Sequence, residues 1–200
     1  MESRRGRSVR NVCVSIVVLA GLICSQATAA EKTATWVGAA GGGDGVFYDD
    51  PNNWDIDGGG NPGQEVPTNN GFDTYTVGCL CAAARFNVFD AGDPGKIYDV
   101  VQLTLAQGGA LDVDPARKLN VIDAAAISGN ISTAGGSFTA LSAASSFGSR
   151  TTVIDVSGAG TFRHGSTGAY LTPLFFGDVL RADGAGSLLD LSGLQTIDAG

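Results

Sequence analysis

Basic residues are scarce in this sequence: 12 Lys and Arg stand against 20 Asp and Glu, giving a net charge of −8. The first 29 residues hold one acidic residue and four of the basic ones, namely Glu2, Arg4, Arg5, Arg7 and Arg10. Without residues 1–29, 8 basic and 19 acidic residues remain, and the net charge becomes −11. Binding to nucleic acids or to anionic membrane surfaces needs a basic face. Neither function is therefore expected.

Long apolar runs are absent too, since no stretch reaches the roughly 20 apolar residues of a membrane span. The run "NVCVSIVVLAGLI" at residues 11–23 follows the basic start and precedes Ala27-Thr28-Ala29. A basic start, a short apolar run and small residues at a cleavage site are typical of a secretory signal. The sequence predicts a signal peptide over residues 1–29, a secreted or cell-surface location, and no integral membrane segment.

Cysteine and histidine are rare, with four Cys and one His. Outside the leader only Cys79 and Cys81 remain, and in a strand their side chains would share a face, near the upper limit for a disulfide. They are candidates for a local disulfide, because two thiols without further ligands are too few for zinc. His164 is accompanied by no G-x-S-x-G nucleophile motif, so no catalytic triad is expected.

Helical periodicity is missing as well, because Gly, Ser, Thr or Asp interrupts every window. Glycine makes up 30 of 200 residues, about twice the usual ~7%. Short alternating runs such as "VVQLTL", "KLNVI", "TTVIDV" and "SLLDL" are frequent instead. Alternation with frequent turns predicts short strands and an all-β protein.

Three columns of residues recur at intervals of 24 to 27 residues. A Gly-x-apolar pattern begins at Gly109, Gly136, Gly160 and Gly186. Two apolar columns are Val101, Ile127, Val153, Val179 and Val121, Phe147, Leu171, Ile197. These columns predict a parallel β-helix of about four coils, over 101–126, 127–152, 153–178 and 179–200, with Val153 and Phe162 inside. Stacked coils share one core, and the glycines are expected at corners where φ changes sharply.

The last predicted coil is short and leaves a strand edge uncovered, which solenoids normally cap. We therefore expect a chain truncated at its C-terminus. Residues 187–191 are expected to pair in parallel with residues 160–163, one coil earlier.

Residues 30–78 differ in composition from the coils predicted over 79–200. They hold both tryptophans, in a Thr-Trp-x-Gly, Gly-Asp-Gly, Asn53-Trp54, Pro pattern that leads into the strand "DTYTV". This pattern, with the later "ISGNISTAGGSF" and "GAGSLLDLSGL", resembles exported autotransporter-like β-solenoid proteins. Such proteins are common in planctomycete secretomes and in chains with PEP-CTERM-type or dockerin-type tails. The resemblance implies a Trp/Gly-rich N-terminal cap segment and carries no catalytic residues.

Two binding sites are candidates in the cap segment. Asp55-x-Asp57 followed by Glu65 resembles the start of a calcium loop, although Gly59 replaces the third ligand and Glu65 falls one residue short. Calcium is the one cofactor that the sequence suggests. Carbohydrate stacking is the second candidate, on an aromatic face formed by Trp36, Trp54, Phe47 and Tyr48. The glycines at 58–63 match a nucleotide motif by letter, but no helix follows to hold phosphates.

The sequence favours an exported structural, cell-surface or matrix protein without catalytic activity. One alternative is a carbohydrate-binding module. The other is a polysaccharide lyase or hydrolase, because Asp112 and Asp114 share a strand face and further Asp residues recur near turns (Asp123, Asp155, Asp190 and Asp198). Lone Asp at turns is ordinary turn chemistry. Expected partners are a cell-surface polysaccharide or other copies of the chain.

Overall fold

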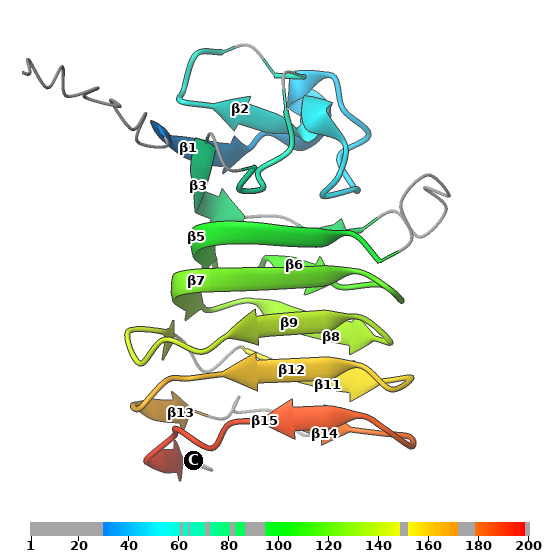
Figure 1. Ribbon diagram of the computed structural model, residues 1–200, viewed down its shortest axis with the longest axis vertical. Helices are drawn as coiled ribbons and strands as arrows, with labels where there is room; N and C mark the ends of the chain where they lie inside the picture. The colour runs from blue at the N-terminus through cyan, green and yellow to red at the C-terminus, as the bar shows by residue number, and fades with distance from the viewer. Residues whose placement is uncertain are drawn as a thin grey trace, which may run out of the picture.

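The computed structural model describes residues 30–60, 62–63, 65–70, 73–80, 83–86, 95–148, 152–171 and 179–198. They form a β-solenoid of about four turns, which confirms the predicted fold class. Figure 1 shows the coils stacked from the N-terminal cap at the top to the C-terminal coil at the bottom. Within these ranges, no helix has the length and apolar character needed to cross a membrane.

Three sheets form the sides of the solenoid, and the strands pair in parallel except for β1 with β2. The first sheet contains, in spatial order, β15 (Leu188–Asp190), β12 (Thr161–His164), β9 (Ser137–Ala140), β7 (Lys118–Ile127), β5 (Ile97–Leu105), β3 (Asp73–Leu80), β1 (Ala30–Trp36) and β2 (Trp54–Ile56), with β10 (Ser146–Phe147) beside β7. The second contains β14 (Leu180–Ala182), β11 (Ile154–Ser157), β8 (Asn130–Ala134), β6 (Ala110–Asp112) and β4 (Ala83–Arg85). The third pairs β13 (Ala169–Leu171) with β16 (Thr196–Asp198).

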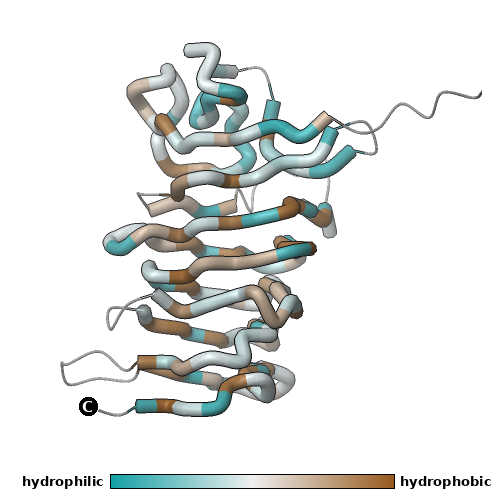
Figure 2. The backbone as a smooth tube through the Cα atoms, turned by 90° about the vertical axis from the view of Figure 1, so that its left-hand side faces the viewer, coloured by the Kyte–Doolittle hydropathy of each residue, from teal (hydrophilic) through white to brown (hydrophobic). Residues whose placement is uncertain are grey.

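The core runs through the middle of the stack, because alternate residues of each strand point inward. In the first sheet Tyr98, Leu119, Phe138 and Phe162 are register partners in successive coils, and all four are buried. Figure 2 shows hydrophobic segments recurring from coil to coil along the stack. Phe162 therefore points inward, as predicted.

Two glycines of the repeated pattern are required by close stacking of the backbone. A Cβ on Gly136 would overlap the carbonyl oxygen of Val113, and one on Gly160 would overlap that of Thr133. Neither glycine has a positive φ. The predicted reason, a sharp change of φ at a corner, is therefore wrong for these two, although Gly186 has a φ of 85°.

The predicted apolar columns are only partly correct. Val153 lies between buried Thr152 and Ile154 and is itself partly exposed, so its predicted inward position is wrong. Leu111 is buried in the second sheet over Ile131 and not over Phe138. In the coil after Phe162, the observed register differs from the predicted one by one residue.

In that last step Leu189 faces Phe162, whereas Leu188 points outward and is 46% exposed. The predicted pairing of 187–191 with 160–163 is confirmed, because β12 and β15 are parallel neighbours.

The predicted boundaries cut through strands. The expected division between cap and coils at residue 78 falls inside β3, which already pairs in parallel with β5. The expected coil boundary after residue 126 falls inside β7. In the third predicted column, Leu171 faces Asp198 and Tyr170 faces Ile197, so this column is also shifted by one residue.

Candidate functional site

The cap is built around two aromatic side chains that are completely buried, Tyr48 and Trp54. Trp54 Nε1 donates a hydrogen bond to the Tyr48 carbonyl oxygen at 2.7 Å, and the two rings meet edge to face with centroids 4.8 Å apart. Trp36, which is partly buried, contacts Trp54 at an interplanar angle of 86°. Tyr48 and Trp54 close the top of the core and cannot present a ring face to a sugar.

Phe47 remains partly exposed and joins the cap to the second sheet. It forms a parallel bridge with Arg85 of β4, whose guanidinium lies 6.0 Å from the ring centroid. Of the four predicted carbohydrate-stacking residues, only Phe47 and Trp36 keep exposed area. The structure therefore does not assemble the four into one exposed face.

Asn53 is a buried polar residue that the sequence did not single out beyond its place in the Asn-Trp pair. Its Nδ2 donates to Asp44 Oδ1 at 2.9 Å and to the Phe47 carbonyl at 2.7 Å, and its Oδ1 accepts from the Gly45 amide at 2.9 Å. The carboxylate of Asp50 accepts hydrogen bonds from the backbone amides of Asp44 and Asn52. These contacts satisfy turn amides, so the acidic residues here hold the loop.

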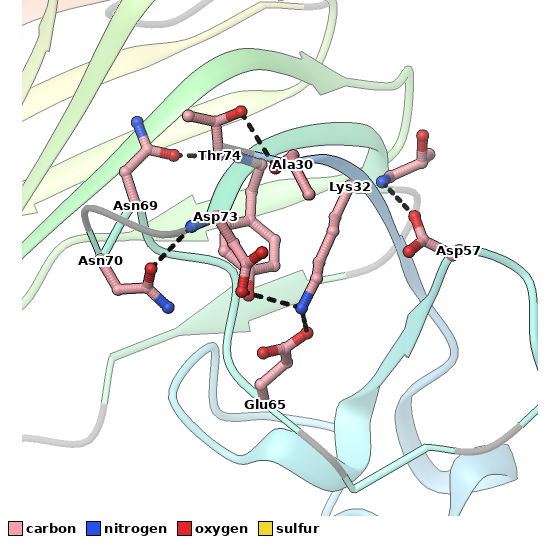
Figure 3. Close-up of polar contacts among 10 residues, drawn as sticks. Ala30, Lys32, Asp57, Glu65, Asn69, Asn70, Asp73 and Thr74 are labelled. Atoms are coloured by element: carbon pink, nitrogen blue, oxygen red, sulfur yellow. Dashed lines mark hydrogen bonds and ion pairs between the residues drawn. The ribbon is translucent and has the colours of Figure 1, made fainter. Parts of the chain in front are cut away.

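Lys32 ties the cap loop to the first sheet. Its Nζ lies 2.6 Å from Glu65 Oε1 and 3.0 Å from Asp73 Oδ2, as Figure 3 shows. These hydrogen bonds to Glu65 and Asp73 raise the pKa of Lys32 above its ordinary value. No local pattern in the sequence indicates this link, because Glu65 lies 33 residues from Lys32.

The three residues predicted to bind calcium each contact a different partner in the chain. Asp57 accepts the Thr33 amide, Asp55 accepts the Gly60 amide, and Glu65 pairs with Lys32. Within the described ranges no group of three or more His, Cys, Asp or Glu side chains is placed to hold a metal ion. The calcium site stays a prediction.

A small hollow lies on the cap, lined by Val37, Ala40, Gly41, Asp55, Gly60 and Pro62. Its volume is about 190 Å³, below the roughly 300–1,000 Å³ of typical ligand pockets. Its lining offers a single carboxylate, which already accepts the Gly60 amide.

Cys79, in β3, is disulfide-bonded in the structure. Its predicted partner, Cys81, lies outside the described residues.

Asp112 and Asp114 lie at the end of β6, close to Arg85 of the neighbouring coil. Arg85 Nη2 is 3.1 Å from Asp114 Oδ2, and Asp112 is the register partner of Arg85. Burial and the charge of Asp114 raise the pKa of Asp112. Two carboxylates and an arginine thus meet on the outer face of the second sheet, with one carboxylate bound in an ion pair.

His164 lies inside the lower coils, with its ring 4.3 Å from that of Phe147. Neither ring nitrogen has a hydrogen-bond partner among the described residues. Burial lowers its pKa to about 4, and the nearby backbone of Ala125 offsets only part of this shift. The expectation that His164 belongs to no triad stays untested, but its position is that of a neutral core residue.

This burial predicts a pH-dependent stability. The unfolded chain should bind a proton at His164 near pH 6.5, whereas the folded chain resists it until about pH 4. The free energy of unfolding should therefore be level just above pH 6.5 and fall as the pH drops toward 4. Urea unfolding at a series of pH values measures this.

His164→Phe is the matched variant, because His164 is the only histidine in the chain and its neighbours are aromatic. The slope between pH 6.5 and about 5 should largely vanish in this variant, whereas below about pH 5 carboxylates such as Asp44 and Asp190, whose pKa values are lowered in the folded chain, also contribute. An unchanged slope would assign the pH dependence to the carboxylates instead.

Comparison of the chain with protein-family models, with curated proteins and with solved structures found no match.

Proposed function

We propose that this chain is an exported, non-catalytic β-solenoid that acts as a structural module at the cell surface or in an extracellular matrix. The observation that carries the proposal is the uninterrupted stack, in which the first sheet continues from β1 in the cap to β15 in the last coil. An extended object of this kind suits a spacer or scaffold, because each coil contacts mainly its neighbours.

Polar side chains on the outside of the first sheet support this proposal, because they join neighbouring coils. Asn120 Nδ2 donates to Asp99 Oδ1 at 2.8 Å, and Arg163 Nε donates to Asp190 Oδ2 at 3.2 Å. Each pair consists of register partners in successive coils. These polar side chains therefore contact the next coil.

The finer assignment, to the autotransporter-like proteins with sorting or dockerin tails, is also part of the proposal. Its support is the Trp-rich segment, which lies where a cap is expected. Tyr48 and Trp54 seal the end of the core, as the cap of such a solenoid should. Cell-surface polysaccharide and other copies of the chain are the proposed partners.

The two alternatives have less support from the geometry. A carbohydrate-binding module would have to work with Trp36 and Phe47, because the other two aromatics are buried. A polysaccharide-cleaving enzyme would have to work with Asp112 and Asp114, of which the second is paired with Arg85 on a strand face.

Export is the part of the proposal that is simplest to test. The 200-residue chain with a C-terminal tag, expressed in bacteria, should leave the cytoplasm, and its mature N-terminus should be Ala30 or Glu31. Edman sequencing of the exported material gives this residue. A Val17→Asp variant, with a charge in the apolar run, should stay inside the cell.

Exported material that still begins at Met1 would contradict the signal-peptide prediction. Release of reducing sugars from a polysaccharide panel by the purified protein would contradict the non-catalytic part.

A further inference from the structure

Lys32 and Asp73 lie next to each other on two neighbouring parallel strands, β1 and β3. In their register, Lys32 is the partner of Tyr75, which is buried. Asp73 precedes Tyr75 by two residues, so its side chain lies on the same face of the sheet. Only 22% of the Lys32 side chain and 23% of the Asp73 side chain are exposed. An amine and a carboxylate therefore meet where the first sheet joins the cap, largely covered by the protein.

A second carboxylate, that of Glu65, approaches the same amine from the cap loop. Lys32 Nζ lies 2.6 Å from Glu65 Oε1 and 3.0 Å from Asp73 Oδ2, and Figure 3 shows both contacts. The centroid of the Tyr75 ring is 5.6 Å from the same nitrogen. Burial and a hydrogen bond to Glu65 raise the pKa of Tyr75 to about 12, so its hydroxyl keeps its proton at neutral pH. The amine thus has two carboxylates and a neutral hydroxyl around it.

These groups have the composition that an amide bond requires. An ammonium and a carboxylate become an amide and one water, so no oxidant, reductant or activating group has to be supplied. Glu65, at the shorter distance, takes one proton from the Lys32 ammonium. The electron pair freed on Nζ forms the bond to Asp73 Cγ, and one C–O bond of Asp73 breaks. The leaving oxygen becomes water with two protons, one carried by Glu65 and one lost from Nζ.

We propose that Lys32 and Asp73 form an intramolecular amide bond, with Glu65 as the base that carries the proton. The bond joins β1 to β3 and closes a covalent loop around residues 33–72, which hold the Trp/Gly-rich cap segment. The cap is then locked to the coils at their junction. The bond does not depend on the proposed role at the cell surface, so either proposal can fail alone.

The geometry favours this reaction, whereas the charges slow it. Well-oriented groups within one molecule reach effective concentrations on the order of 10⁵–10⁸ M. Against this, the hydrogen bonds to Glu65 and Asp73 raise the pKa of Lys32, so the neutral amine is a minor form. The bond has to form only once in each molecule, and a slow step is sufficient. We therefore expect the amide to accumulate over hours to days after folding.

The direct test is tryptic digestion of the 200-residue chain, after the purified protein has stood for a week at neutral pH and has then been reduced and unfolded. Residues 33–84 contain no Lys or Arg. A free Lys32 therefore gives one peptide that ends at Lys32 and a separate peptide 33–85. An amide at Lys32 blocks this cut, so one peptide should run through Lys32 to Arg85, lighter than its sequence by one water, about 18 Da. Complete cleavage after Lys32 would overturn the proposal.

Fragmentation of the uncleaved peptide in the mass spectrometer locates the bond. The fragments should join Lys32 to Asp73. A bond from Lys32 to Glu65, or a loss of water without any bond to Lys32, would overturn the assignment. Lys118, whose side chain is exposed, is the internal control, because trypsin should cleave after it completely in the same digest.

Three variants test the roles of the acidic residues. Asp73→Ala should abolish the uncleaved peptide. Glu65→Gln keeps a hydrogen-bond acceptor for Lys32 but takes up no proton, and it should slow formation of the uncleaved peptide by about a hundredfold or more. Glu31→Gln is the matched control and should leave the rate unchanged, since Glu31 is exposed and accepts a hydrogen bond from Thr76. Far-UV circular dichroism checks that each variant is folded. Equal rates for Glu65→Gln and Glu31→Gln would overturn the role of Glu65 as the base.

Discussion

Replacing Phe162 with alanine should lower the free energy of unfolding by about 3–5 kcal/mol, the usual range for truncation of a buried phenylalanine. Phe162 has no exposed area, and its ring stacks on that of Phe138 with centroids 5.2 Å apart and planes 11° apart. The alanine would leave a cavity between two coils that share one continuous core. Urea unfolding of the purified variant measures the loss.

Thr161→Ala is the matched control, because Thr161 lies on the same strand and is partly exposed. It should change stability by less than about 0.5 kcal/mol. If Phe162→Ala cost under about 1 kcal/mol, the residue would not be part of the stacked column.

Gly160→Ala should destabilise the protein by about 3 kcal/mol, the upper end of the usual range for overpacking. A methyl group there would overlap the backbone oxygen of Thr133 in the coil above, and that oxygen belongs to a paired strand that cannot move alone. Gly168→Ala is the control, since its Cβ would come no closer than 3.6 Å to Ser166 Oγ. Thermal unfolding of both variants compares them, and equal midpoints would contradict the close stacking.

The sequence predicts the lower coils better than the upper ones, and the reason is the length of the coils. From Phe138 to Phe162 the register step is 24 residues, and from Phe162 to Leu189 it is 27. From Tyr98 to Leu119 it is 21, and from Leu119 to Phe138 only 19. A search for one period near 26 finds the long coils and misassigns the short ones.

The hydrophobic pattern also could not determine the strand register to within one residue. Leu188 and Leu189 are both apolar, so the alternation alone cannot say which of them lies beneath Phe162. The turn before β15, with Gly184 and Gly186 both at positive φ, sets the register. The lengths of such turns are not encoded in hydrophobic spacing.

In the cap, the sequence leaves the role of the aromatic residues undetermined for a different reason. Its aromatic residues are typical of both a sugar-stacking face and a sealed core end, and composition does not separate the two. The structure separates them through the fully buried Tyr48 and Trp54 and through Asn53, whose three hydrogen bonds fix the loop over them. Lys32, which links the cap loop to β3, depends on a contact 33 residues away in the sequence that no local pattern indicates.

The central claim, a parallel stack with a defined register, is tested most directly by one distance measured in solution. Spin labels at residues 99 and 190 would sit at the two ends of the outward column Asp99, Asn120, Thr139, Arg163 and Asp190, which contains four strand-to-strand steps. At about 4.8 Å per step, the backbones at these two positions lie about 19 Å apart. Double electron–electron resonance should therefore give a narrow distribution of distances between the two spin labels, centred near this value. A broad distribution, or a mean distance twice as long, would contradict the stacked β-solenoid.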